Sequence, residues 1–381
     1  MSDLSGVLVI SIEQAVAAPY VSGRLAEAGA RVIKIERDAG DFARDYDRLV
    51  HGESAYFVWL NRGKESVCLD IKSPDGKAIL DEMLGRADVF IQNLAPGAAD
   101  RLGLDPDSLR ARNPRLITLS INGYGDEGPY AARKAYDLLV QAETGLSAIT
   151  GNAGGPARVG VSVCDIASGM TAYQSVLQAL YARERTGRGR HVSVSLYHAL
   201  ADWMNVPYLQ YVYGGKTPDR RGLSHPTIAP YGVFACEGGH EILVAIQNER
   251  EWARFCDLVL GDADLARDAR FATNSDRVAH RGALDAIIAG VFATRDRDAV
   301  SDALTGADIA CGQVSSMADL AEHPQNRFVT VDTPSGPVRL LGPGALTDGA
   351  MPDYGPVPAL GADTDRVRAE FAPQRRGNRA G

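Results

Sequence analysis

The sequence predicts an α/β protein, with a doubly wound, Rossmann-like large domain joined to a smaller α+β domain. Short apolar, β-branched runs alternate with longer segments that carry the three-to-four-residue apolar repeat of helices. A strand at 7–12, a helix at 18–29 and a strand at 31–36 have the spacing of a βαβ crossover, which predicts a parallel pair. Hydrophobic residues make up 45% of the 381 residues and charged residues 23%, as is typical of a soluble globular protein with a sizeable core.

The other elements of the large domain follow in order along the chain. The helix at 18–29 begins near Pro19, a residue that a first helical turn tolerates, and it stops at Gly29. An amphipathic helix at 73–87 opens on a Ser-Pro start, and a short helix is expected at 105–114. Strands are expected between and after these helices, at 66–72, 88–94 and 115–123.

The stretch RVGVSVCDIASGM, residues 158–170, places one carboxylate between a strand pattern and a helix pattern. Its β-branched run predicts a strand that ends at Asp165, followed by a long helix as far as TGRG and a strand at 191–196. Binding sites of α/β proteins lie where strands meet the helices that follow them. The sequence therefore predicts a functional site at Asp165.

The character of the sequence changes after about residue 200, which ends the large domain at 1–200. Residues 201–230 are first aromatic and then rich in Pro and Gly, which predicts a linker. Residues 231–315 are expected to form the small domain, and 316–381 to contain strand-like and loop-like pieces with a final short helix. Within the small domain we expect a turn, a strand and a helix over 238–260, and helices at about 281–294 and 297–305.

Composition excludes several classes of protein. The formal charge of -8 argues against a globally basic nucleic-acid-binding protein. Five dispersed cysteines without a CxxC pair argue for a reducing, cytoplasmic compartment and against a zinc site. No histidine has a metal-ligand spacing, so no metal is expected. There is no apolar run of about 18 residues and no signal peptide, so no membrane partner is expected.

A dinucleotide site is the first alternative to consider, because Glu36 ends the second strand where an acid would bind a ribose. The turn after the first strand, however, holds no G-x-G-x-x-G, and without those glycines the backbone cannot approach a pyrophosphate. We therefore expect neither NAD nor FAD.

Asp165 itself has two interpretations. It could cap the helix that follows, since an Asp at a helix start accepts backbone N–H bonds. Alternatively, an exposed carboxylate near a helix N-terminus stays ionised and can act as a nucleophile, with Asp137 upstream helping to position it. The small residues around Asp165 favour the second interpretation, because we expect them to leave room for a ligand: Ser162, Cys164, Ala167, Ser168 and Gly169.

Several motifs in order resemble the class III coenzyme A transferases (CaiB/BaiF type), which include formyl-CoA and carnitine CoA-transferases. The resemblance covers nearly the whole chain and rests on these stretches: GARVIKIER with GDFAR, NRGKESVCLDIKSPDGK, NLAPGAADRLGL, YDLLVQAETGL, VCDIASGM, RERTGRGRHVSVSL and IACGQVSSMADLAEHPQ. It implies a CoA-transferase in which Asp165 is the nucleophile. Its carboxylate would form an acyl-aspartyl anhydride and then an aspartyl-CoA thioester, from which a second acid takes the CoA.

The resemblance also implies where CoA, a substrate of the reaction, would bind. Arg37, Lys72, Arg101 and Lys134 are the candidates for its phosphates. The positions that match the family's CoA-binding motifs are Val16, Ala17, Arg37, Leu69, Lys72, Asn93, Leu94, Ala95, Arg101, Arg133, Lys134, Ala135 and Tyr136.

Two departures from the family pattern bear on specificity. Formyl-CoA transferases carry Gln where this chain has Val16, which argues against formate–oxalate exchange. They also carry a run of glycines over the active site, where this chain has RRGLSHPTIAPYG; this loop, with His225 at its tip, is expected to shield the anhydride. Arg220, Arg221 and His225 form a plausible cationic cluster for a second carboxylate, which predicts a dicarboxylic acid such as succinate, itaconate or mesaconate.

The family fold further implies an interlocked homodimer. Its two subunits thread through each other by long linkers, here at about 200–230 and 315–340, and the C-terminal segment returns to the large domain. Two other functions stay open. An α-methylacyl-CoA racemase shares the fold but needs a His-Asp pair where this chain has Tyr136-Asp137. A non-catalytic CoA-binding protein would have no use for Asp165.

Overall fold

A computed structural model describes residues 2–373. Within this range the chain divides into two compact units. The larger unit holds residues 2–147, 158–208 and 327–373, and the smaller unit holds residues 148–157 and 209–326. No helix in this part of the chain is long and apolar enough to cross a membrane.

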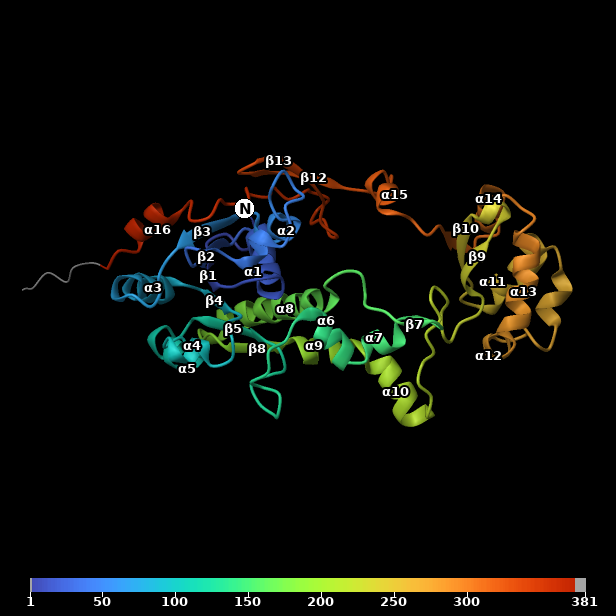
Figure 1. Cartoon of the computed structure of the whole chain (residues 1–381), viewed down its shortest axis with the longest axis horizontal. Coiled ribbons are helices and arrows are strands. Elements are labelled where there is room, and N and C mark those ends of the chain that lie inside the picture. Colours follow the sequence, from blue (N-terminus) through green and yellow to red (C-terminus); the bar gives the residue numbers. More distant parts are fainter. Residues whose placement is uncertain (1, 374–381) are drawn as a thin grey trace, which may run out of the picture. The chain divides into compact units, whose positions relative to one another are not determined.

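The larger unit is built on a six-stranded, fully parallel sheet in the order β3-β2-β1-β4-β5-β8 (Figure 1). The chain adds β2 and β3 on one side of β1 and then β4, β5 and β8 on the other side. This is the strand order of doubly wound folds. The predicted parallel α/β class is therefore confirmed. The strands are β1 (Leu8–Ile12), β2 (Arg31–Glu36), β3 (Lys64–Cys68), β4 (Val89–Gln92), β5 (Ile117–Asn122) and β8 (His191–Ser195).

Each face of this sheet has its own core, because successive strand residues point to opposite faces. Val9 joins the core that contains α1 (Ala17–Glu27), α8 (Val163–Thr186) and α9 (Leu196–Trp203). The next residue, Ile10, joins the opposite core. That core contains α3 (Pro74–Arg86), α5 (Pro106–Arg112) and α16 (Thr364–Glu370).

The remaining elements of the chain are mostly short. The shorter helices in the first half are η1 (Phe42–Asp45), α2 (Ala55–Asn61), α4 (Ala98–Arg101), α6 (Asp137–Glu143) and α7 (Leu146–Ile149). Further along lie α10 (Asn205–Gly214), α15 (Met317–Ala321) and the hairpin of β12 (Phe328–Thr333) and β13 (Gly336–Leu341). The C-terminal segment is tied to the sheet of the larger unit, since the Ser66 N–H donates to Asp363 and Arg31 pairs with Glu370.

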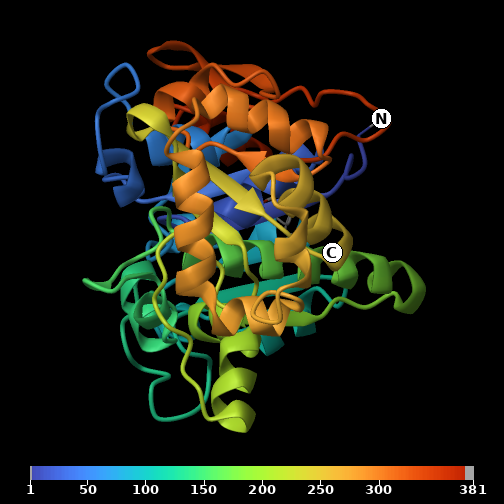
Figure 2. The same cartoon turned by 90° about the vertical axis from the view of Figure 1, so that its right-hand side faces the viewer.

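The smaller unit has an antiparallel sheet in the order β11-β10-β9, of which β9 and β10 are yellow in Figure 2. Its core is aromatic and includes Trp252, Phe255, Phe271 and Phe292. The strands are β6 (Gly151–Asn152), β7 (Gly155–Pro156), β9 (Tyr231–Ala235), β10 (Glu241–Ala245) and β11 (Ala310–Gly312). The helices are η2 (Glu237–Gly239), α11 (Glu249–Arg254), η3 (Phe255–Leu260), η4 (Ala263–Arg267), α12 (Asn274–Ala279), α13 (Arg281–Phe292) and α14 (Arg297–Gly306).

Two predicted strands are wrong in whole or in part. The strand expected before Asp165 does not form: the Val159 N–H donates to the Gln141 side chain at 3.0 Å, and the open side of β5 is taken by β8. The strand expected at 66–72 ends early at Cys68, because Asp70 starts a turn in which its carbonyl accepts the Ser73 N–H.

The small residues after Asp165 also have a role different from the expected one. Cys164, Ala167, Ser168 and Gly169 are all buried in α8, so they do not open space for a ligand. A Cβ on Gly169 would lie 2.8–3.0 Å from atoms of Tyr20 on α1. The small side chains therefore let α8 approach its neighbouring helices closely.

Replacement of Gly169 by Ala is expected to lower the free energy of unfolding by about 1–3 kcal/mol, because the added methyl must displace the Tyr20 ring. Chemical denaturation measures the change. Gly85→Ala on α3 is the matched control: a Cβ there meets nothing within 4 Å, so it should raise stability by up to about 1 kcal/mol. Equal effects of the two substitutions would contradict this account.

Candidate active site

A cleft of about 320 Å³ lies at the carboxyl ends of β1, β4 and β5 in the larger unit. Parallel sheets place ligands at this edge. The cleft brings together residues from distant parts of the chain, and many are those that the sequence predicted. The predicted residues in its wall are Ala17, Asn93, Leu94, Ala95, Arg133, Lys134, Ala135, Tyr136, Asp137 and Asp165.

Other predicted CoA-binding residues lie elsewhere. Arg37, Leu69 and Lys72 line a neighbouring cavity of about 500 Å³, which shares Gln14 and Leu94 with the cleft. Val16 and Arg101 line neither of the two cavities. Val16 is buried at the start of α1, and the exposed Arg101 ends α4.

Asp165 lies in the first turn of α8, half-buried, with its side chain in the wall of the cleft. It does not cap the helix. Asp137, at the start of α6, does so instead, because its Oδ2 accepts the backbone N–H groups of Cys164 at 2.8 Å and Asp165 at 3.1 Å. The other oxygen of Asp137 accepts a bond from the Gln141 amide at 2.5 Å. The carboxylate of Asp137 thus orients the first turn of α8, which carries Asp165.

The electrostatics of Asp165 differ from the sequence expectation of an exposed, permanently ionised group. Burial, and then the negative charge of Asp137, raise the pKa of Asp165 to about 7. The helix N-terminus favours the ionised form, but these two effects outweigh it. Near neutral pH, Asp165 therefore exchanges between a protonated form and an ionised carboxylate.

Replacement of Asp165 by Asn is expected to stabilise the protein at high pH. The pKa of Asp165 in the folded chain, about 7, lies above its ordinary value of 3.8, so its ionisation destabilises the fold increasingly from about pH 4 to pH 7 and fully above pH 7. Its removal should raise the free energy of unfolding by about 1–4 kcal/mol at pH 8, and the gain should shrink towards zero near pH 4. Urea denaturation at both pH values tests this expectation. A gain that does not depend on pH would contradict the cause proposed here.

The side chains that sequence reasoning missed come mainly from two loops. Gln14, Ala15, Asn122 and Gly123 follow the ends of β1 and β5, so the rule that sites lie at the carboxyl edge could have found them. Phe42 and Tyr46 had no such signal, because they reach the cleft from a 3-10 turn. The missed lining residues are Gln14, Ala15, Phe42, Tyr46, Pro96, Ile121, Asn122, Gly123 and Leu196.

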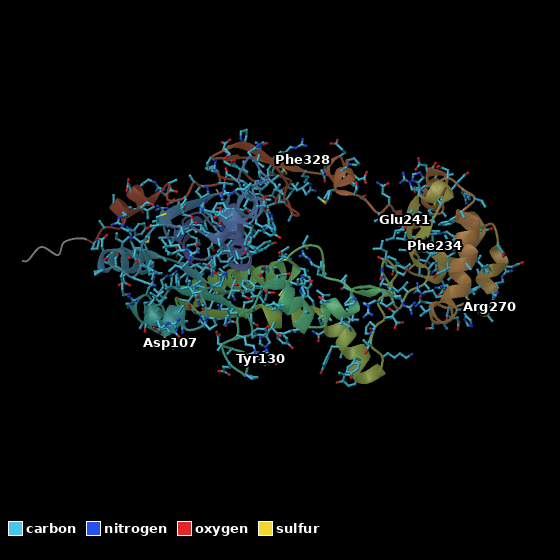
Figure 3. All side chains as sticks on the ribbon, viewed as in Figure 1. Asp107, Tyr130, Phe234, Glu241, Arg270 and Phe328 are labelled. Atoms are coloured by element: carbon cyan, nitrogen blue, oxygen red, sulfur yellow. The ribbon has the colours of Figure 1, made fainter. Side chains whose placement is uncertain are left out.

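The two cations in the wall of the cleft differ in how they are held. The guanidinium of Arg133 stacks on the ring of Tyr130 at 3.7 Å, on the loop labelled in Figure 3, and lies 3.9 Å from Glu143. Lys134 is exposed and has no ion-pair partner among residues 2–373. Lys134 is therefore the cleft cation that is available to an anionic ligand.

The predicted acid-binding residues Arg220, Arg221 and His225 belong to the smaller unit. Arg220 donates to the carbonyl oxygens of Ala148 and Asn152, and Arg221 pairs with Asp219 at 2.8 Å. Burial and then the charge of Arg281 lower the pKa of His225, so it is neutral at pH 7. His225 would therefore meet a carboxylate as a hydrogen-bond donor and not as a cation.

Comparison with known proteins identifies the family of this chain. Residues 4–364 match the model of CoA-transferase family III. The chain is 36% identical over 372 residues to an acetyl-CoA:oxalate CoA-transferase of Acetobacter aceti, covering 96% of this chain and 95% of the relative. It is 36% identical over 332 residues to a succinate–glutarate CoA-transferase of Agrobacterium fabrum, covering 84% and 82%.

The fold agrees with this match. A crystal structure of a CaiB/BaiF family protein from Brucella suis superposes with a TM-score of 0.83 at 33% identity, over 97% of this chain and 99% of that one. The parallel sheet and the full-length family match therefore point the same way. The chain belongs to CoA-transferase family III, and it is an enzyme that moves coenzyme A between an acyl-CoA and a carboxylic acid.

Proposed function

We propose that this enzyme transfers CoA to a dicarboxylic acid through a covalent intermediate on Asp165. The observation that carries the proposal is the position of the Asp165 carboxylate, which lies in the cleft wall on a helix turn oriented by Asp137. A carboxylate whose pKa is about 7 is a stronger nucleophile than an ordinary Asp, and much of it is still ionised at neutral pH.

The reaction balances without a net proton. A carboxylate oxygen of Asp165 attacks the thioester carbonyl, the C–S bond breaks, and an acyl-aspartyl anhydride and CoA thiolate form. The thiolate then attacks the aspartyl carbonyl, which releases the donor acid and leaves an aspartyl-CoA thioester. The acceptor carboxylate attacks this thioester to give a second anhydride, and the thiolate finally takes the new acyl group and frees Asp165. An anhydride and a thioester are both high-energy acyl compounds, so the free energy changes little in each exchange.

CoA binding is proposed to extend over both cavities of the larger unit. Arg37 and Lys72 line the cavity beside the cleft, where their charges would bind phosphates. Gln14 and Leu94 belong to both cavities and would lie along the pantetheine arm. Lys134 has no protein partner among the described residues and adds a third cation. Arg101 and Val16 line neither cavity, so they have the weakest support among the predicted contacts.

The dicarboxylate proposal is supported by the relatives, whose names specify oxalate, succinate and glutarate as acids. The second carboxylate of a dicarboxylic acceptor needs a hydrogen-bond donor or a cation at some distance from Asp165. Arg221 and His225 stay our candidates for that role, while Arg220 already donates to two backbone carbonyls.

The assembly is proposed to be an interlocked homodimer in a cytoplasmic compartment. Exposed aromatic side chains on and next to α10 support a partner chain: Trp203, Tyr208, Tyr211 and Tyr213. The proposed large domain begins with 1–200, 201–230 would be a linker and 231–315 the small domain. Residues 316–381 would be a second linker and the C-terminal return to the large domain; residues 1 and 374–381 lie outside the described residues. Five unpaired cysteines support a reducing compartment. Sedimentation as a monomer at micromolar concentration would contradict the dimer.

A substrate screen tests the proposed function. Purified enzyme is incubated with succinyl-CoA or acetyl-CoA and a panel of mono- and dicarboxylic acids, and the new acyl-CoA is measured. Dicarboxylates are expected to react, and a reaction confined to monocarboxylates would overturn the acceptor class. Exchange of the α-proton of a 2-methylacyl-CoA in D2O distinguishes the racemase. We expect none, because the described residues that line the cleft include no histidine to act as a second base.

A further inference from the structure

The turn after β1 forms one wall of the cleft in an unusual backbone conformation. Ala15 has a φ of 65°, in the left-handed region that residues other than glycine seldom adopt. Gln14 and Ala15 both line the cleft, and the first residue of α1 follows two positions later. Such a conformation persists only where surrounding groups fix it. What fixes this turn therefore matters for the shape of the cleft.

Two side chains from other parts of the chain hold the turn. Asn93 exchanges two bonds with the Gln14 backbone: its Oδ1 accepts the N–H at 3.0 Å, and its amide donates to the carbonyl at 2.8 Å. Asp41 accepts the Ala15 N–H at 3.1 Å through Oδ1. The strained residue itself is thus held by Asp41.

Asp41 in turn is fixed by a buried network of charges. Its Oδ2 accepts a bond from Lys34 at 2.6 Å, and the Oδ1 atom of Asn61 accepts bonds from both Lys34 and Lys64. Lys64 also pairs at 2.8 Å with Glu13, the residue before Gln14. The two carboxylates and two ammonium groups have fully buried side chains, so their charges balance away from water.

The same carboxylate also holds a second wall of the cleft. Asp41 is the N-cap of η1, and its Oδ1 accepts the Ala43 N–H at 2.9 Å. This short helix carries Phe42 into the cleft, and Tyr46 follows at its end. Asp41 therefore connects the turn after β1 to the cleft wall formed by Phe42 and Tyr46. Both of its carboxylate oxygens accept hydrogen bonds from protein groups.

We propose that Asp41 is a positioning residue for CoA transfer, which acts by holding Ala15 in the left-handed conformation. In that conformation Gln14 and Ala15 line the part of the cleft wall that would face the acyl-CoA beside Asp165. The inference rests on the proposed function, since it assigns the turn a role in presenting the thioester to that carboxylate. Asp41 is not a catalytic residue, because its side chain is fully buried and its carboxylate is bonded to protein groups.

Asp41→Asn and its combination with Ala15→Gly test the proposal. The single variant places an amide against Lys34 and loosens the bond to Ala15, so kcat should fall roughly 10–100-fold with a smaller change in KM. Glycine adopts the left-handed conformation without help. The double variant should therefore recover at least about fivefold in kcat, while its melting temperature stays as low as that of Asp41→Asn. Ala15→Gly alone is measured beside it, as the reference for what the substitution itself does to kcat.

A recovery of kcat without a recovery of stability is a result that a merely structural role does not give. Asp45→Asn is the matched control: its side chain is 64% exposed and, within residues 2–373, pairs only with Arg48, so kcat should not change. If Asp41→Asn does not fold, Asp41→Glu replaces it, because it keeps the charge beside Lys34 but moves the carboxylate off the Ala15 N–H. Wild-type kcat in a folded Asp41 variant, or no recovery of kcat when Ala15→Gly is added to it, overturns the inference. Absence of CoA transfer by the wild-type enzyme would instead overturn the proposed function.

Discussion

Replacement of Asp165 by Asn is expected to lower the rate of CoA transfer by roughly 10³-fold or more, because the amide cannot form an anhydride. The fold should survive, since no described group donates a hydrogen bond to the Asp165 carboxylate and the cap of α8 comes from Asp137. Turnover is measured from the appearance of the new acyl-CoA. Acyl-CoA and hydroxylamine added together should convert Asp165 of the wild-type enzyme to a hydroxamate, which peptide mass spectrometry locates.

The control for this experiment is Asp107→Asn on α5, labelled in Figure 3, whose carboxylate is 93% exposed. It should transfer CoA at the wild-type rate. Transfer by Asp165→Asn at a normal rate, or a hydroxamate on another residue during turnover, would refute the covalent route through Asp165. Activity lost together with the folded state would be recognised from the melting curve, which Asp165→Asn is expected to shift upward at pH 8.

Replacement of Asp137 by Asn is expected to move the acid limb of the pH–rate profile. In the wild-type enzyme kcat/KM should fall below pH 7, because the nucleophilic form of Asp165 becomes scarce; at pH 6 about a tenth of it remains. The amide removes the negative charge that helps to raise the pKa of Asp165. The acid limb should therefore shift to lower pH, and the ratio of activity at pH 6 to that at pH 8 should rise.

Asp137→Ala separates the charge of Asp137 from its hydrogen bonds. Alanine removes both, so the limb should shift as in Asp137→Asn while kcat falls further, because the N–H groups of Cys164 and Asp165 lose their acceptor. An acid limb that stays near pH 7 in both variants would show that burial alone sets the pKa of Asp165. The profile is read between pH 5 and 9, with the stability of each variant measured over the same range.

These two carboxylates explain each other's roles. Asp137 orients the turn that carries Asp165 and also makes its ionisation costly, so one group affects both the position and the pKa of Asp165. The sequence pointed to both residues but offered only Asp165 as a candidate cap, whereas Asp137 caps α8. A helix cap from the same chain segment is the usual case, whereas this cap comes from a residue 28 positions upstream.

The sequence predicted much of the sheet because its signals are local. The strand at 31–36 and the helix starting beside Pro19 follow from apolar periodicity and from glycine or proline at their ends, and both lie within two residues of the observed elements. The false strand before Asp165 had the same local signal. It failed because β8 occupies the position beside β5, a competition that no local pattern records.

By itself the sequence determined the parallel α/β class and the motifs of the family, and it pointed to Asp165 as the candidate nucleophile, because each depends on residue type and on spacing along the chain. Tertiary structure alone decided that Asp165 titrates near neutral pH, that small residues of α8 serve packing, and that Asp41 holds Ala15. Burial and charge proximity arise only when segments far apart in the chain meet, and a pKa or a clamped turn depends on those distances.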